Sequence, residues 1–162
     1  MSPRLHFNKG FTLVELVTIM IILGILAAVA IPRMNSAQSF RSVEFRDKTI
    51  AALRFAQKTA TSHRRLVCVE FEAASVTLTI NHDKIGYCDN HPLVIPGQSD
   101  NVVQSSDTSR GVFNQIPFPI YFQPDGRGTT DEEGKTNALI DAEIGGLSVY
   151  VAGATGYVGS KP

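Results

Sequence analysis

The sequence has no excess of charge of either sign. Fifteen Lys and Arg residues balance fifteen Asp and Glu residues, so the formal net charge of the 162 residues is zero. Proteins dedicated to nucleic-acid binding usually carry a strongly basic face, so such a role here would need a local patch. The one compact basic cluster beyond the N-terminus is His63-Arg64-Arg65. It is explained by favourable charge at the end of a predicted helix, and DNA-phosphate contact by Arg64 and Arg65 stays open as the alternative.

The sequence also lacks the usual patterns of catalytic and metal sites. No serine lies in a nucleophile elbow, and no paired carboxylates mark a cleft. Gly134-Lys135-Thr136 matches the end of a phosphate-binding loop, but the first glycine of that loop would be at Thr129. A cluster of metal-ligating residue types lacks the tight paired spacings of a zinc site: His82, Asp83, Cys88, Asp89 and His91. We therefore expect no enzyme activity, no cofactor and no metal.

Cysteine is scarce, since Cys68 and Cys88 are the only two in the chain. Outside the cytoplasm such a pair is free to form a disulfide. A bond closing a loop of that size would contribute about 3 kcal/mol in the chain-entropy model. Two unrelated buried thiols are the alternative.

A long apolar run dominates the N-terminal region. From Phe11 to Ile31 only Thr12, Glu15 and Thr18 are clearly polar. As a helix this run would be about 31 Å long, enough to cross the hydrocarbon core of a bilayer. A carboxylate in hydrocarbon costs a few kcal/mol, so Glu15 should meet a positive partner. Cleavage after Gly10 would supply one, because it leaves a free amino group on Phe11.

The segment Lys9-Gly10-Phe11-Thr12-Leu13-Val14-Glu15, with a short basic leader before it and Pro32 after it, resembles the prepilin signature of type IV pilins and type II secretion pseudopilins. The resemblance implies that a prepilin peptidase cuts between Gly10 and Phe11 and that Phe11 is N-methylated. It implies that Glu15 then helps to dock the subunit into a growing filament.

Two other interpretations of this region fit less well. An ordinary secretory signal would have a shorter apolar core and could be cleaved near Ala28-Val29-Ala30. A plain membrane anchor would account for the length of the run but not for Gly10 or Glu15.

The resemblance also implies an organisation, a location and partners. We expect a leader peptide at 1–10, a transmembrane and assembly helix at 11–31, a helix continuation at 32–63 and an extracytoplasmic β-sheet domain at 64–162. Before assembly the protein would be a single-pass inner-membrane protein with a periplasmic domain, and afterwards part of an extracellular pilus. Its partners would be other pilin subunits, the prepilin peptidase, the inner-membrane assembly platform and, before assembly, the membrane. Nucleic acid is a possible partner that the sequence does not favour.

The pattern after the apolar run predicts that the helix continues to about Thr61. Pro32 should kink or interrupt it, because proline removes a backbone donor. At helical spacing, one face carries the expected core residues Val43, Ile50, Leu53 and Ala60. Three aromatic residues fall off this face and are either additional core residues or contacts to neighbouring subunits: Phe40, Phe45 and Phe55.

From Leu66 onward the apolar period changes from helical to two-residue, which predicts strands. We expect a hairpin over 66–80, a long irregular loop over 86–111, a strand around 118–122, an exposed loop over 128–135 and short strands at 138–144, 147–151 and 157–158. The whole is an α+β arrangement, a long N-terminal transmembrane and amphipathic helix packed on an antiparallel β-sheet, as in the pilin fold.

The soluble part resembles the GspH/FimT-type minor pilin domain and, as a close relative, a minor pilin of the mannose-sensitive haemagglutinin system. The resemblance rests on Leu53-Arg54-Phe55-Ala56, Val67-Cys68-Val69, Phe122-Gln123-Pro124-Asp125-Gly126 and Thr155-Gly156-Tyr157-Val158. It implies a structural minor pilin that enters a type IV pilus or primes its assembly. The alternatives are a DNA-binding minor pilin for natural transformation and a type II secretion pseudopilin of the GspH type.

Overall fold

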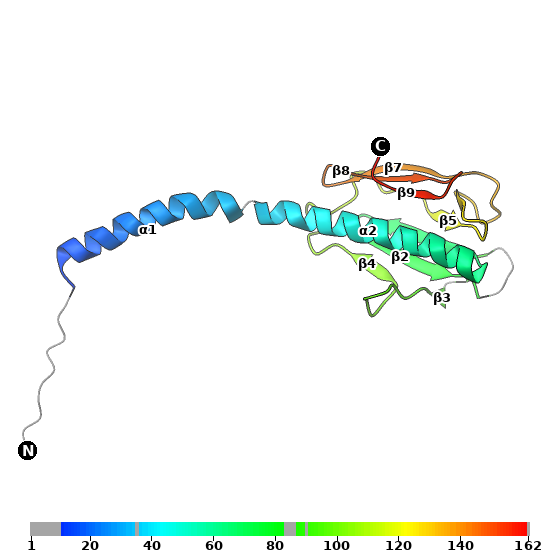
Figure 1. Ribbon diagram of the computed structural model, residues 1–162, viewed down its shortest axis with the longest axis horizontal. Coiled ribbons are helices and arrows are strands. Elements are labelled where there is room, and N and C mark those ends of the chain that lie inside the picture. Colours follow the sequence, from blue (N-terminus) through cyan, green and yellow to red (C-terminus); the bar gives the residue numbers. More distant parts are fainter. Residues whose placement is uncertain (1–10, 35, 83–86, 90, 162) are drawn as a thin grey trace, which may run out of the picture. The chain divides into compact units, whose positions relative to one another are not determined.

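The computed structural model describes residues 11–34, 36–82, 87–89 and 91–161, with no side chains given for 28–39 (Figure 1). The chain forms two compact units, Met1–Ala37 and Gln38–Pro162, and each is described by itself. Over these described residues, two helices are followed by nine short strands, an α+β fold that confirms the predicted fold class.

Helix α1, Leu13–Met34, makes up most of the first unit. It begins after Thr12, whose side-chain Oγ1 accepts a hydrogen bond from the backbone N–H of Glu15 at 3.3 Å. Thr12 therefore acts as the N-cap and occupies one of the backbone donors that every helix start leaves unpaired. The helix continues through Pro32, so the chain is not interrupted at the predicted position.

Helix α2, Ser36–His63, supplies one wall of the core of the second unit. Its buried residues recur at helical spacing: Phe45, Ile50, Leu53, Ala56 and Ala60. The prediction that Val43 belongs to this face is wrong, because Val43 is 38% exposed and Phe45 takes the place at the start of the buried stripe. The aromatic residues divide, since Phe55 is partly buried against the core while Phe40 is 70% exposed.

Helix α2 ends at a left-handed residue. Arg64 has φ of 53°, and the N–H of Arg65 bonds to the carbonyl of Ala60 at 3.1 Å. This is the usual geometry of a helix C-terminus, where glycine is normally found. The turn sends the chain directly into the first strand.

The larger sheet contains six strands in the order β3-β2-β1-β5-β6, with β4 also pairing with β2. The predicted hairpin is confirmed, because β1 (Val67–Glu72) and β2 (Ser75–Ile80) pair antiparallel over six residues each. The other strands are β3 His91–Pro92, β4 Val102–Gln104, β5 Ile120–Phe122 and β6 Gly128–Thr129.

Two expectations about loops are wrong. The region 86–111 contains β3 and β4, and Val103 of β4 is fully buried against the core. The region 128–135 begins with β6, whose Gly128 and Thr129 are buried and pair with β5. Strands of two or three residues are too short to show an alternating pattern, so their place in the sheet depends on their neighbours.

The last three strands form a second sheet, whereas the sequence suggested a single one. β7 (Leu139–Ile144), β8 (Leu147–Ala152) and β9 (Tyr157–Gly159) pair antiparallel in that order. The β7–β8 hairpin turns at Gly145 and Gly146, both at positive φ (56° and 81°), as a tight two-residue hairpin turn requires.

The two sheets meet at a ring of backbone hydrogen bonds. The N–H of Gly128 donates to the carbonyl of Gly153, Gly153 donates to Ala138, and Ala138 donates to Gly128, at 2.9, 2.7 and 2.8 Å. A Cβ on Gly153 would lie 2.0 Å from the Gly128 oxygen. Only glycine therefore allows the three backbones to approach so closely.

Polar side chains of α2 bind the second sheet and its flanking turn. Arg46 Nε donates to the carbonyl of Ser148 at 3.1 Å and Arg54 Nε to the carbonyl of Val158 at 2.9 Å. Gln57 Nε2 donates to the carbonyl of Gly126 at 2.9 Å. These bonds satisfy carbonyls of β8, β9 and the β5–β6 turn, so α2 is held to the second sheet by polar contacts as well as by the core.

Candidate assembly site

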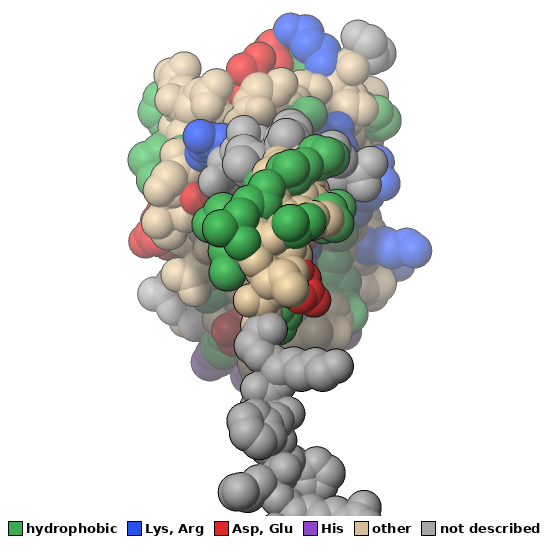
Figure 2. Space-filling view, turned by 90° about the vertical axis from the view of Figure 1, so that its left-hand side faces the viewer, with side chains coloured by type: hydrophobic (Ala, Val, Ile, Leu, Met, Phe, Trp, Pro, Cys, Tyr) green, Lys and Arg blue, Asp and Glu red, His purple; other side chains and the backbone are tan. Residues whose placement is uncertain are grey.

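The described surface of α1, up to residue 27, is largely apolar on all sides. The described residues 11–27 are all exposed, including Phe11 at 75% and Leu13 at 80%. Figure 2 shows hydrophobic side chains gathered over this helix. A helix that is hydrophobic all round is normally enclosed by other apolar matter, either protein or lipid. This surface therefore calls for surroundings that a single copy of the chain does not provide.

Among the described side chains of α1, the clearly polar ones lie in its first two turns. Thr18 Oγ1 donates to the carbonyl of Val14 at 2.8 Å, and Thr12 is occupied by the N-cap bond described above. Within the described part of the chain, the Glu15 carboxylate has no ion-pair or hydrogen-bond partner. Its position in the first turn is favourable for a negative charge, because the helix dipole is positive there.

The processing residues are only partly visible. Gly10 lies outside the described residues, and Phe11 is the first residue with a described side chain. Cleavage between Gly10 and Phe11, N-methylation of Phe11 and the docking role of Glu15 stay predictions.

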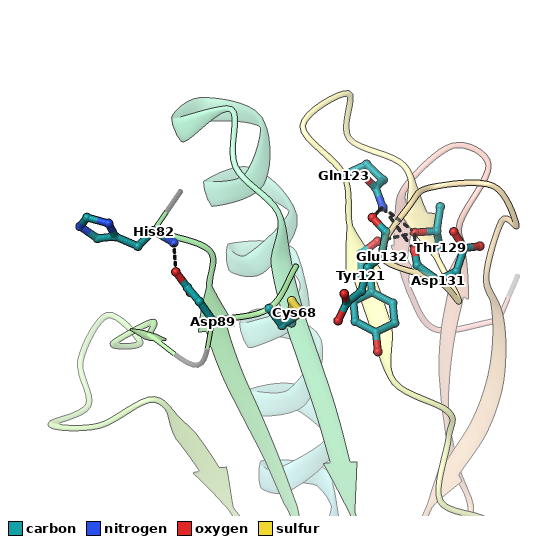
Figure 3. The surroundings of a disulfide bond; sticks show 9 residues. Cys68, His82, Asp89, Tyr121, Gln123, Thr129, Asp131 and Glu132 are labelled. Carbon is teal, nitrogen blue, oxygen red and sulfur yellow. Dashed lines mark hydrogen bonds between the residues drawn. A yellow bond between two sulfur atoms is a disulfide. The ribbon is translucent and has the colours of Figure 1, made fainter. Parts of the chain in front are cut away.

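The disulfide between Cys68 and Cys88 is present, as predicted, with a Cα–Cα distance of 6.2 Å (Figure 3). Cys68 lies on β1 and is 3% exposed. The bond attaches the segment after β2 to the middle of the larger sheet. Beside it, the N–H of His82 donates to Asp89 Oδ2 at 2.7 Å.

The described metal-ligating residue types near this disulfide do not form a site. Cys88 is oxidised, and Asp83 lies outside the described residues. The rings of His82 and His91 contact each other edge to face with their centroids 4.9 Å apart. Among the described residues, no group of three His, Cys, Asp or Glu side chains could hold a metal ion.

The basic cluster at the end of α2 lies beside carboxylates. Arg64 and Arg65 line a hollow of about 210 Å³ together with Gln123, Glu132 and Glu133. Figure 3 shows Gln123, which directly follows β5, close to the loop that carries Glu132. The surface around the two arginines therefore carries charges of both signs, which weakens its attraction for phosphate.

The Gly-Lys-Thr segment is a turn closed by Asp131. The Asp131 carboxylate accepts hydrogen bonds from the backbone N–H groups of Lys135 and Thr136 at 2.8 and 2.7 Å. The bond from Lys135 is the main reason that the pKa of Asp131 lies below its usual value. Lys135 itself pairs with Glu133, so the backbone donors and the lysine of this segment are already engaged within the loop.

Sequence reasoning missed Gln123, which organises the same loop. Its Nε2 donates to Thr129 Oγ1 at 2.8 Å and to the carbonyl of Glu132 at 3.2 Å. The segment around Gln123 was noted for its resemblance and for the turn after it, and neither feature indicates which backbone its amide would reach.

A family model described as the prokaryotic N-terminal methylation motif matches residues 5–31. The matched residues include Gly10, Phe11, Glu15 and most of α1. The match supports a type IV pilin-like, prepilin family for this chain, and with it a structural protein that is anchored in a membrane and then assembled with other pilins after processing by a prepilin peptidase. The comparison with curated proteins finds no match, and neither does the comparison with solved structures.

None of the helices in the described part of the chain has the length and apolar character needed to cross a membrane.

Proposed function

We propose that the chain is a structural minor pilin that enters a type IV pilus, or primes its assembly, through α1. The observation that carries this proposal is the all-round exposed apolar surface of α1 with one carboxylate, Glu15, in its first turn. The second unit buries its own core, so it can fold without α1 being covered. Such a division suits a subunit that folds first and assembles later.

The proposal gives Glu15 a specific partner. Cleavage after Gly10 would leave a positive amino group on Phe11, four residues before the carboxylate. In a bundle of helices the apolar faces need no specific contact, but an unpaired buried charge is destabilising by several kcal/mol. We expect the Phe11 ammonium of a neighbouring subunit to pair with Glu15 as the new subunit enters.

Before assembly, the apolar helix would be held in the inner membrane as a single span, with the second unit in the periplasm. The Cys68–Cys88 disulfide supports this side of the membrane, because disulfides persist in the periplasm and are rare in the cytosol. The alternative of DNA binding through Arg64 and Arg65 is not favoured, because Glu132 and Glu133 share their hollow.

The processing step is tested by the intact mass of the protein purified from its native host. The mass should correspond to a chain that begins at N-methylated Phe11. Retention of Met1, or a start at Ile31 as an ordinary signal peptidase would produce, would remove the basis of the proposal.

The assembly step is tested by complementing a deletion strain with Glu15→Ala. This variant should be cleaved normally and its second unit should fold, but pili should be lost or strongly reduced in electron micrographs. Glu70→Ala, which removes an exposed carboxylate from β1, is the matched control and should restore piliation. Normal pili with Glu15→Ala would show that the carboxylate is merely tolerated.

A further inference from the structure

The two cysteines of the Cys68–Cys88 disulfide differ in exposure. Cys68 alternates along β1 with Val67 and Val69, which belong to the core. The Cys68 side chain is therefore on the outer face of the larger sheet, yet the residue is only 3% exposed. Cys88 lies in the described segment 87–89 and is partly exposed. A reagent from solution therefore meets Cys88 before it meets Cys68.

Neighbouring strands enclose Cys68. It pairs directly with Thr79 of β2 on one side and with Tyr121 of β5 on the other. Directly paired residues place their side chains on the same face about 5 Å apart, so Thr79 and Tyr121 flank the Cys68 side chain. A thiolate attacks a disulfide sulfur in line with the S–S bond, from the side away from the leaving sulfur. Such an approach to Cys68 would have to pass between the side chains of three paired strands.

The quality of the leaving group acts in the opposite direction. Attack at Cys68 would release Cys88, and the more exposed thiolate is the better leaving group. This preference matters only where both sulfurs can be reached, because the rate of exchange also depends on access. In the folded chain access decides, so attack is directed at Cys88.

The surroundings of Cys88 are rich in carboxylates. Its neighbour Tyr87 lines an open hollow of about 450 Å³, which is large enough to admit a small thiol. The charged residues of this hollow are three acids and one base: Asp131, Glu132, Glu133 and Lys135. The base is already paired with one of these acids. Asp89, which follows Cys88 in the chain, adds an exposed carboxylate.

Negative charge also lies beside Cys68. The pKa of Tyr121, its direct partner on β5, is raised by burial and then by the charges of Glu132 and Glu70. Figure 3 shows Glu132 beside Tyr121. The two arginines at the end of α2 line a separate hollow with Glu132, so they reduce this negative charge without reversing it. Carboxylates therefore border the disulfide from the sheet and from the loop.

From these observations we infer that the disulfide is a site of thiol–disulfide exchange at which the incoming thiolate attacks Cys88, and that the site selects thiols carrying positive charge. The incoming sulfur forms a bond with Cys88 Sγ while the Cys68–Cys88 bond breaks, and the electron pair of that bond leaves with Cys68 Sγ as a thiolate. The incoming sulfur is thereby oxidised to a mixed disulfide and Cys68 is reduced. In the reverse direction the Cys68 thiolate attacks the mixed disulfide, expels the small thiolate and closes the bond.

The position of attack is tested on the full chain in neutral detergent. Cysteamine, which is positive, is compared with neutral 2-mercaptoethanol and negative 3-mercaptopropionate, and exchange is stopped at short times with N-ethylmaleimide in guanidinium. Trypsin cuts after Arg65, Lys84 and Arg110, so each cysteine lies on its own peptide and mass spectrometry shows which one carries the small thiol. In the folded chain the adduct should be on Cys88 at least about tenfold more often than on Cys68. In the unfolded chain, where both sulfurs are accessible, this preference should fall below about twofold.

The charge preference is tested by rates. For each thiol the rate with the folded chain is divided by the rate with the unfolded chain, which cancels the intrinsic reactivity of the thiol. At low salt the corrected rate should be at least about fivefold higher for cysteamine than for 3-mercaptopropionate. The difference should shrink as added salt brings the Debye length below about 10 Å. Glu132→Gln should reduce it, whereas Glu143→Gln, which removes an exposed carboxylate from β7 in the second sheet, is the matched control and should leave it unchanged.

The inferred position of attack is overturned if the folded chain carries the adduct equally on both cysteines or mainly on Cys68. It is also overturned if the folded chain does not exchange while the unfolded chain does. The inferred selectivity is overturned if the corrected rates do not depend on the charge of the thiol, or if Glu143→Gln changes them as much as Glu132→Gln.

Discussion

The Cys68–Cys88 bond is the feature whose energetic role can be worked out most directly. The bond links a buried position on β1 to a residue 20 positions later in the chain. Reducing it leaves every side chain in place, so the loss of stability should come mainly from the greater freedom of the unfolded chain. This makes reduction a cleaner perturbation than substitution, because replacing buried Cys68 would also leave a small cavity.

The expected magnitude follows from the separation. In the chain-entropy model a loop of about 20 residues contributes about 3 kcal/mol at room temperature. The second unit, Gln38–Pro162, has an unfolding entropy of about 2.1 cal/mol/K per residue. A loss of about 3 kcal/mol should therefore lower its melting temperature by roughly 10 °C.

The assay is thermal unfolding of the full chain in neutral detergent, followed by circular dichroism at a wavelength dominated by the sheets. The wild-type chain is compared with and without a phosphine reductant, and thiol labelling confirms that both cysteines are free after reduction. The Cys68→Ala/Cys88→Ala chain is the control and should melt at the same temperature in both conditions. A fully reduced wild-type chain that melts within about 3 °C of the oxidised one would refute the reasoning.

Three further predictions concern the second unit. Gly153→Ala should reduce the free energy of unfolding by more than about 3 kcal/mol, measured by urea denaturation, because its Cβ would meet the Gly128 oxygen at 2.0 Å. Arg64→Gly should raise the free energy of unfolding in the same assay by up to about 1 kcal/mol, because glycine adopts a φ of 53° without steric cost; a loss of stability would contradict this. The hydrogen bond from Lys135 lowers the native pKa of Asp131. The stabilisation of the loop by this bond is therefore present above the unfolded pKa of about 4, and it is lost as the pH falls through the lower native pKa. The protection factor for amide exchange at Lys135 should fall as the pH drops below about 4 in the wild-type chain and should be low at all pH values in Asp131→Ala.

Sequence patterns predicted the helices and strands that are long enough to show a hydrophobic period. The six-residue strands β1 and β2 show clear alternation, and α2 places its buried residues at helical spacing. The strands β3, β4 and β6 are two or three residues long, so they show no period. Their place is decided by the partner strand, which the local sequence does not encode.

The split into two sheets was also beyond sequence patterns. It depends on the backbone ring of Gly128, Ala138 and Gly153, which involves main-chain groups far apart in the chain. A pattern analysis likewise assigns arginines to the exposed surface, yet Arg46 and Arg54 donate to carbonyls of the second sheet.

The residues of the candidate assembly site can be named from the sequence alone, and their roles stay predictions. Gly10, Phe11 and Glu15 are fixed by short offsets in sequence, so no long-range contact is needed to recognise them. By contrast, Arg64 was noted for its charge, and its left-handed conformation became visible only with the structure. That conformation ends α2, and this structural role of Arg64 does not depend on any contact with phosphate.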